Sequence, residues 1–171
     1  NSQPVPDQKA EAQARELIAT KWPTLTLESL LSYGVKLTPT SLWAPHTDSK
    51  GIIRGIKIRS IPSGSKYSVD GSNYSSRLYR VKETHPSSET LLICEGESDL
   101  WCLQKWIDDQ GYTSTMSVLS LPSGASMWRD NWTEEVENWG HVVMLLDNDD
   151  AGNKAMDKIQ DNLGSSLVER P

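Results

Sequence analysis

The chain has 171 residues, of which 36% are hydrophobic, so it is long enough to bury a core and too apolar to be disordered. Two cysteines are too few for a four-thiolate zinc site, and no apolar run reaches the roughly 18 residues of a membrane span. Because no signal peptide opens the sequence either, we expect a protein that is soluble and cytoplasmic and has no membrane partner.

The formal charge of −6 is unevenly distributed along the chain. Between residues 50 and 82 there are eight lysines and arginines and one acidic residue, which gives a local charge of +7 and leaves −13 for the remainder. Such segregation is typical of a protein in which one surface meets phosphate and another holds cations. A solvated strand face is the alternative interpretation of the same residues.

The chain begins with two predicted helices. The first follows the N-capping Asp7, carries apolar residues at helical spacing and ends before Pro23. The second covers residues 27–33, with Thr26 as its N-cap and Gly34 as its C-cap. The first helix carries no visible chemistry and is predicted to serve packing.

A small, basic, antiparallel lobe is predicted to follow. Residues 37–49 contain two prolines and predict a connecting loop, in which His46 is interpreted as a surface histidine. The isoleucine-rich residues 51–60 predict a strand, residues 66–67 lie on a mobile connection or a short hairpin, and residues 77–82 predict the returning strand. The basic side chains of this lobe include Arg54, Lys57, Arg59 and Lys66.

Residues 87–171 alternate between apolar strands and helical patterns, which predicts an α/β domain with a parallel sheet of about four strands and helices on both faces. We therefore divide the chain into a lobe of residues 1–86 and this second domain. The predicted strands cover residues 91–94, 114–119 and 141–146 and begin again at 166–168, and the predicted helices cover 98–110 and 153–163. A further helical stripe contains Trp128, Trp132, Val136 and Trp139, which we interpret as core residues, with base stacking as the alternative.

Two strands of the second domain end abruptly in acidic residues. Glu95 and Asp99 follow the first strand, and Asp147 and Asp149 follow the third. Ligands of open parallel sheets bind beyond the carboxyl ends of the strands, so we expect these four side chains to share one crevice. Carboxylates that lie close together repel one another unless cations neutralise them. Because one or two carboxylates per ion suit Mg²⁺, the sequence predicts a magnesium site.

The acidic motifs resemble those of the toprim domain, which is named for topoisomerases and primases. Its marks are a strand-end Glu-Gly-x-x-Asp and a later strand-end Asp-x-Asp, here residues 95–99 and 147–149. The sequence is also similar to the RNA-polymerase domain of bacterial and phage primases, above all to the primase half of phage primase-helicases. That likeness includes a Lys-x-Arg strand at 57–59, a basic-aromatic pair at 66–67 and a Ser-Leu-x-x-Gly-Ala loop at 120–125. The resemblance implies a toprim fold for the second domain.

The resemblance also implies a function, which is RNA primer synthesis on a single-stranded DNA template from ribonucleoside triphosphates, dependent on Mg²⁺ or Mn²⁺. Asp147 and Asp149 would bind the metal directly, and Glu95 would bind it or orient a metal-bound water. Asp99 belongs to the implied catalytic set, although it could instead cap a backbone amide. Glu97 is interpreted as a solvated residue or as one that contacts the metal ligands without binding the ion itself. The implied nucleotide-binding or nucleic-acid-binding residues are Lys57, Arg59, Lys66 and Arg54, and the implied supporting residues are Gly96, Ser123 and Gly124.

The sequence departs from the primase pattern in two respects. Primases place a zinc-binding module ahead of this domain and use a further acidic residue after the Asp-x-Asp helix, and neither has a match here. We therefore expect a fragment of a longer bacterial or phage protein that works with zinc-binding and helicase modules. A toprim nuclease with the same metal site and a non-catalytic toprim module that binds DNA are the alternative functions.

Overall fold

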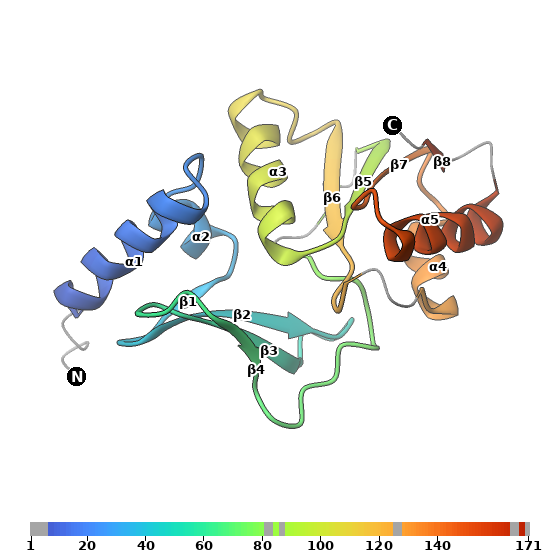
Figure 1. Ribbon diagram of the computed structural model, residues 1–171. Coiled ribbons are helices and arrows are strands. Elements are labelled where there is room, and N and C mark those ends of the chain that lie inside the picture. Colours follow the sequence, from blue (N-terminus) through green and yellow to red (C-terminus); the bar gives the residue numbers. More distant parts are fainter. Residues whose placement is uncertain (1–6, 81–83, 86–87, 125–127, 165–167, 170–171) are drawn as a thin grey trace.

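The computed structural model describes residues 7–80, 84–85, 88–124, 128–164 and 168–169. Within these residues, an N-terminal part forms an antiparallel sheet with two helices, and a C-terminal part forms a parallel sheet with helices on both faces (Figure 1). This architecture confirms the predicted α/β class. No helix of the described ranges is long and apolar enough to cross a membrane.

Both predicted N-terminal helices are confirmed. Helix α1 (Gln8–Lys21) begins where the Asp7 carboxylate accepts hydrogen bonds from two backbone N–H groups of the first turn. Helix α2 (Leu27–Ser32) begins with a capping box in which Thr26 and Ser29 satisfy each other's backbone N–H groups. Their buried apolar residues share one core with the start of the antiparallel sheet and with the parallel sheet.

The antiparallel sheet has the strand order β1-β2-β3-β4. Its strands are β1 (Lys36–Leu37), β2 (Ser41–Thr47), β3 (Ile53–Ser60) and β4 (Lys66–Ser68). Strands β3 and β4 confirm the strand and the hairpin predicted for this segment, whereas β2 shows that the loop predicted at 37–49 is wrong. A proline within β2 is tolerated because β1 pairs only with Leu42 and Trp43, so at Pro45 the strand has a partner on one side only.

The parallel sheet has the order β6-β5-β7-β8, and all neighbouring strands run in the same direction. The strands are β5 (Thr90–Cys94), β6 (Met116–Ser120), β7 (His141–Leu145) and β8 (Val168–Glu169), and the helices are α3 (Glu97–Asp109), α4 (Asp130–Val136) and α5 (Asp150–Leu163). The predicted elements are confirmed with shifted ends. Helix α5 begins three residues earlier than predicted because Asp149 caps it. Residues 166–167, where the last strand was predicted to start, lie outside the described residues.

The strand predicted at 77–82 is wrong over its described part. Tyr79 instead forms an isolated bridge to Ser120 at the end of β6, with N–O distances of 2.9 and 3.0 Å. Helix α4 holds the preceding residues, because the Trp132 indole donates a hydrogen bond to the Ser75 carbonyl at 3.1 Å. Leu78 is therefore buried in the core of the C-terminal part, whereas Tyr79 belongs to the core that the two parts share.

Strand β5 separates two cores, because successive side chains of a strand point to opposite faces. Leu92 and Cys94 face α3 and the N-terminal helices, whereas Leu91 and Ile93 face α4 and α5. The stripe residues Trp128, Trp132 and Val136 are buried in the second core, and Trp139 packs against it. The stripe therefore serves packing, as predicted.

Gly152, in the first turn of α5, packs tightly against the loop that carries the acidic residues. A Cβ atom at this position would overlap the carbonyl oxygen of Asp147. We therefore expect Gly152→Ala to displace the loop and to lower the free energy of unfolding by about 1–3 kcal/mol, the usual cost of overpacking. Thermal unfolding followed by circular dichroism should show this as a loss of roughly 2–12 °C in the melting temperature.

Gly140→Ala is the matched control for this experiment. A Cβ atom there would lie 3.7 Å from the Glu89 carbonyl oxygen, which is ordinary contact, and Gly140 does not have a positive φ. Its free energy of unfolding should stay within about 0.5 kcal/mol of wild type. Equal melting temperatures of the two variants would contradict the close packing inferred for Gly152.

Candidate functional site

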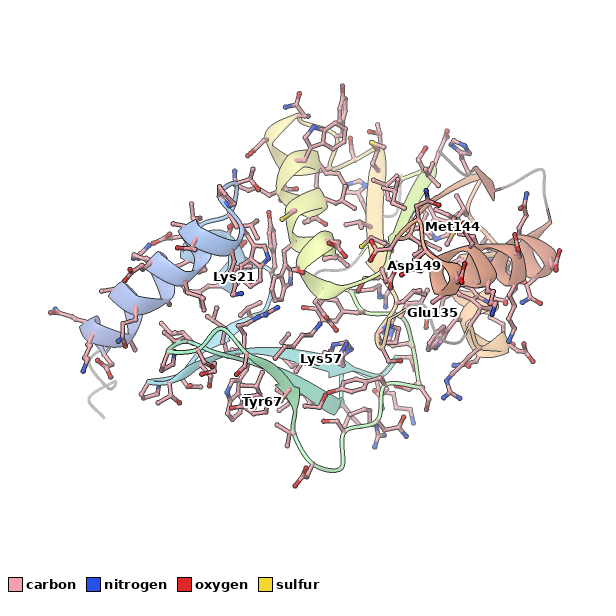
Figure 2. The ribbon with its side chains drawn as sticks, in the orientation of Figure 1. Lys21, Lys57, Tyr67, Glu135, Met144 and Asp149 are labelled. Atoms are coloured by element: carbon pink, nitrogen blue, oxygen red, sulfur yellow. The ribbon has the colours of Figure 1, made fainter. Side chains whose placement is uncertain are left out.

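The two acidic segments lie side by side at the carboxyl edge of the parallel sheet. Strands β5 and β7 pair in register up to Cys94 and Leu145, so their acidic residues follow at neighbouring strand ends. The Oε2 atom of Glu95 accepts a hydrogen bond from the backbone N–H of Asp147 at 3.0 Å. Figure 2 shows Asp149 at the start of α5. The structure thus brings Glu95 and Asp147 together and places Asp149 beside them in the same loop.

Asp99 and Asp149 both bind the backbone at the start of a helix. Oδ2 of Asp99 accepts a hydrogen bond from the Gly96 N–H at 3.1 Å, and Oδ1 of Asp149 accepts one from the Gly152 N–H at 2.7 Å. Burial raises the pKa of Asp99, and the nearby negative charge of Asp147 raises it further. A carboxylate can cap a helix with one oxygen and accept another ligand with the second. Capping is therefore compatible with the predicted role of both residues.

The carboxylates of Glu95, Asp147 and Asp149, which we call the acidic edge, have no cationic partner within the described part of the chain. Among the described residues, no lysine or arginine forms an ion pair with Glu95, Asp147 or Asp149. Asp147 and Asp149 are exposed, and these hard oxygen donors fit Mg²⁺ or Mn²⁺. In the same described ranges, however, no three carboxylate, histidine or cysteine side chains already converge into a group that could hold a metal ion. Metal binding would therefore require these side chains to turn towards the ion.

The loop after β6 lies at the same sheet edge. The Leu121 N–H donates a hydrogen bond to the last carbonyl of β5 at 3.0 Å, which places the loop beside the first acidic segment. Ser123 is exposed, and Gly124 has a φ of 76°, a left-handed conformation that favours glycine. Gly96 is the N-cap of α3. Residue 125 of the predicted loop lies outside the described residues.

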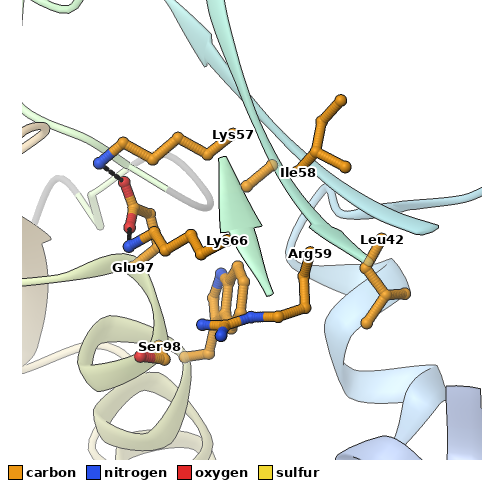
Figure 3. A pocket seen from close by; sticks show the side chains of 9 residues that line it. Leu42, Lys57, Ile58, Arg59, Lys66, Glu97 and Ser98 are labelled. Carbon is orange, nitrogen blue, oxygen red and sulfur yellow. Dashed lines mark hydrogen bonds and ion pairs between the residues drawn. The ribbon is translucent and has the colours of Figure 1, made fainter. Parts of the chain in front are cut away.

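Of the two interpretations of Glu97 made from the sequence, the structure excludes the solvated one. It is 2% exposed, and both of its carboxylate oxygens bind the antiparallel sheet. Nζ of Lys57 lies 2.5 Å from Oε1, and Nζ of Lys66 lies 2.9 Å from Oε2 (Figure 3). Because Glu97 belongs to α3 and the lysines belong to β3 and β4, this ion cluster joins the two parts of the protein.

His46 is also misplaced by the sequence-based prediction, which put it on a surface loop. It is 5% exposed, and its Nε2 atom lies 3.0 Å from Oε1 of Glu97. The ring is held between Tyr74 and Tyr79, with centroid distances of 4.7 and 4.4 Å. Buried side chains alternate with less buried ones along β2. The residue types at positions 41–47 do not alternate in the same way, so the sequence carries no signal that would have placed His46 on a buried face.

Burial and charge act in opposite directions on this cluster. Burial alone would raise the pKa of Glu97, but the contacts with His46, Lys57 and Lys66 outweigh it and hold the pKa well below its usual range. Burial lowers the pKa of Lys57, and the charge of Glu97 offsets part of this effect. Burial also lowers the pKa of His46, so its ring is neutral near pH 7. One carboxylate and two ammonium groups leave the cluster with a net positive charge.

A small pocket, with a cavity volume of about 20 Å³, lies between the antiparallel sheet and the start of α3 (Figure 3). Its lining includes Lys57, Arg59, Lys66, Glu97, Ser98 and Trp101. The Arg59 guanidinium lies 5.3 Å from the centroid of the Trp22 ring and donates a hydrogen bond to the Gly64 carbonyl at 2.9 Å. The structure therefore gathers three of the four predicted basic residues in one pocket. The fourth, Arg54, pairs with Asp48 at 2.7 Å instead.

Residues 89–169 match the family model described as the Toprim domain. This range contains the parallel sheet, its three helices and both acidic segments. No curated protein matches the chain.

Solved structures of similar fold are parts of primases. The primase fragment of the bacteriophage T7 primase-helicase has a TM-score of 0.67 and 21% identity, over 85% of this chain and 61% of the fragment. The zinc-binding and RNA polymerase domains of the Aquifex aeolicus primase have a TM-score of 0.53 and 22% identity, over 93% of this chain and 42% of that chain. The DnaG primase catalytic domain bound to ssDNA has a TM-score of 0.57 and 15% identity, over 99% of this chain and 66% of that chain. The chain thus spans about three fifths of the T7 fragment.

The structural matches extend over more of the chain than the domain match does. The domain match contains the acidic edge, and the structural matches cover enough of the chain to include most of the antiparallel lobe as well. At identities of 15–22% the likeness to these structures is one of fold. Residues 89–169 therefore have a toprim fold, and the chain has the fold of a primase catalytic core.

Proposed function

We propose that this chain is the catalytic, RNA-polymerase part of a DNA primase, which synthesises RNA primers on single-stranded DNA by nucleotidyl transfer. The observation that carries the proposal is the position of α3 between two oppositely charged regions. In its first turn Glu97 binds Lys57 and Lys66, while Asp99 lies close enough to Asp147 for that charge to raise its pKa. A cationic pocket and an acidic edge thus meet within one helical turn.

The reaction needs both regions. In primer extension a 3′-hydroxyl attacks the α-phosphorus of an incoming ribonucleoside triphosphate and expels pyrophosphate. Mg²⁺ or Mn²⁺ held by Asp147, Asp149 and Glu95 would supply compensation for the charge on the attacking and leaving oxygens. The exposed position of both aspartates allows them to hold an ion that a bound triphosphate also contacts.

The cations of the pocket would bind the triphosphate. Arg59 can contact two phosphate oxygens through parallel hydrogen bonds, whereas Lys57 and Lys66 act as point charges. The stacking of Arg59 on Trp22 orients its guanidinium group before any ligand arrives. Binding of the phosphate chain here would place the α-phosphorus towards the acidic edge, where the transfer takes place.

The proposed partners are a single-stranded DNA template and two further protein modules. The basic composition of residues 50–82 supports contact with a phosphate backbone. One structure of similar fold is a primase catalytic domain bound to ssDNA, and others come from a primase-helicase and from a primase with a zinc-binding domain. We propose that helicase and zinc-binding modules act together with this chain.

Metal binding is the first property to test. Millimolar Mg²⁺ or Mn²⁺ should raise the melting temperature of the wild type, because an ion that binds only the folded state stabilises it by about 2.7 kcal/mol at one hundred times Kd. For a chain of this size that is roughly 5–11 °C. The double variant Asp147→Asn with Asp149→Asn should lose this response, because asparagine still caps α5 but carries no charge. Thermal unfolding with and without metal gives the answer.

The double variant Asp109→Asn with Asp161→Asn is the control, since it removes the same charge from exposed positions outside the acidic edge. It should respond to the metal as wild type does. If the acidic-edge variant responds equally well, the metal site is assigned to the wrong residues.

Primer extension tests the proposed reaction itself. A short RNA annealed to single-stranded DNA should be extended when ribonucleoside triphosphates and Mg²⁺ or Mn²⁺ are added. Unprimed template should give much less product, because initiation must order two nucleotides and the template at once. Asp147→Asn should slow extension roughly 100-fold or more, the usual cost of removing one electrostatic element of an active site. Denaturing gel electrophoresis resolves the products.

The same reactions separate the primase from a nuclease. Strand cleavage that depends on the metal and on Asp147, with no extension under any condition, would reject the primase and favour a toprim nuclease. Extension that persists unchanged in Asp147→Asn would reject the assignment of Asp147 to the catalytic metal site.

A further inference from the structure

The buried carboxylate of Glu97 contacts the cations of the pocket, although it takes no part in the proposed transfer. We propose that Glu97 is a positioning residue, which holds the ammonium groups of Lys57 and Lys66 at the wall of the pocket for the phosphate chain of a nucleoside triphosphate. The inference rests on the proposed function, because it assigns the pocket to the nucleotide of that reaction.

The exposures of the three side chains show how the cluster is oriented. The side chain of Glu97 is 3% exposed, that of Lys57 is 12% exposed and that of Lys66 is 44% exposed. The carboxylate therefore lies inside, and Lys66 reaches towards solvent. An ammonium group has three N–H donors, so a contact with Glu97 leaves donors on both lysines for a phosphate.

The surroundings of Glu97 keep its carboxylate in place. The His46 ring lies beside Oε1 and is itself packed between Tyr74 and Tyr79. The Trp101 indole in turn donates a hydrogen bond to the Tyr79 hydroxyl at 3.2 Å, which holds the Tyr79 ring in place. A phosphate that displaced the carboxylate would leave a buried charge without its partners, which is costly. The geometry therefore favours a phosphate that binds the lysines from the open side of the pocket while Glu97 stays paired.

The carboxylate of Glu97 raises the pKa of Lys57 against the effect of burial. The groups that face it are His46 of β2, Lys66 of β4, Glu97 of α3 and Tyr74, whose ring centroid lies 5.1 Å from Nζ, and Arg59 follows two residues later on β3. Burial lowers the pKa of Lys57 and so does the charge of Lys66, whereas Glu97 raises it. Without Glu97, Lys57 would lose its proton at a lower pH, and the pocket would lose a cation as the pH rises.

Binding of inorganic tripolyphosphate tests this role without requiring polymerisation. Isothermal titration calorimetry would compare wild type, Glu97→Gln, Glu97→Asp and Glu28→Gln at pH 7 and pH 9. Glu28→Gln is the matched control, because it removes one negative charge from an ion pair with Arg15 in which the Glu28 side chain is 65% exposed. Glu97→Asp keeps the charge at position 97 but shortens its reach.

We expect wild type and Glu28→Gln to bind tripolyphosphate alike. Glu97→Gln should bind roughly tenfold more weakly at pH 7, which corresponds to one weakened charge-assisted contact. The loss relative to wild type should be greater at pH 9, because removal of the Glu97 charge lowers the pKa of Lys57 further, so a smaller share of Lys57 is charged at the higher pH. Glu97→Asp should bind with intermediate affinity and keep the pH dependence of wild type.

Two results would overturn the inference directly. Tighter binding by Glu97→Gln would show that the carboxylate competes with phosphate, and a loss of the same size at both pH values would show a merely structural role. If Glu97→Gln does not fold, the aspartate variant decides, and wild-type affinity in that variant rejects the inference. Failure of wild type to bind tripolyphosphate rejects it as well, whatever primer extension shows. Failure of extension with the pH-dependent loss of binding intact rejects the proposed function alone.

Discussion

The ion cluster of Glu97 with Lys57 and Lys66 is the contact on which the arrangement of the molecule depends. A carboxylate that is 2% exposed is stable only when it is paired, and both of its cationic partners come from the antiparallel sheet. The parallel sheet and its helices would leave this charge unpaired if they stood alone. The two predicted domains, 1–86 and 87–171, are therefore coupled through the protein interior, and the boundary between them stays a prediction.

The same cluster explains how a protein of net charge −6 can present a cationic pocket. The first turn of α3 carries Glu97 towards the lysines and Asp99 towards the acidic edge, so opposite charges are separated over a short distance. Among the residues that the structure describes, one carboxylate pairs with the two ammonium groups, which leaves the cluster with a net positive charge. On the other side, Asp147 and Asp149 have no lysine or arginine partner among the described residues, and their charge remains available for cations.

Much of the fold follows from local patterns in the sequence. The capping residues Asp7 and Thr26 mark the starts of both N-terminal helices, and the apolar runs before the acidic segments mark parallel strands. The predictions failed where a segment depends on a distant partner. Strand β2 contains a proline that suggests a loop, but the short β1 leaves that position without a second neighbour. The apolar residues after Arg77 suggest a strand, but Leu78 is buried in the core of the C-terminal part and the backbone of Tyr79 pairs with Ser120 at the end of β6.

For the candidate site, the sequence alone specifies the positions of Glu95, Asp147 and Asp149 at strand ends, because the carboxyl ends of parallel strands lie at one edge of the sheet whatever surrounds them. It does not specify the environment of Glu97 or His46, since nothing in their own spacing shows whether water or a distant lysine will face them. Burial of a polar side chain depends on partners from other elements, and those partners meet only in the folded chain. The tertiary structure therefore supplies a contact that the residue pattern could not reveal, a carboxylate of α3 buried against two lysines of the antiparallel sheet.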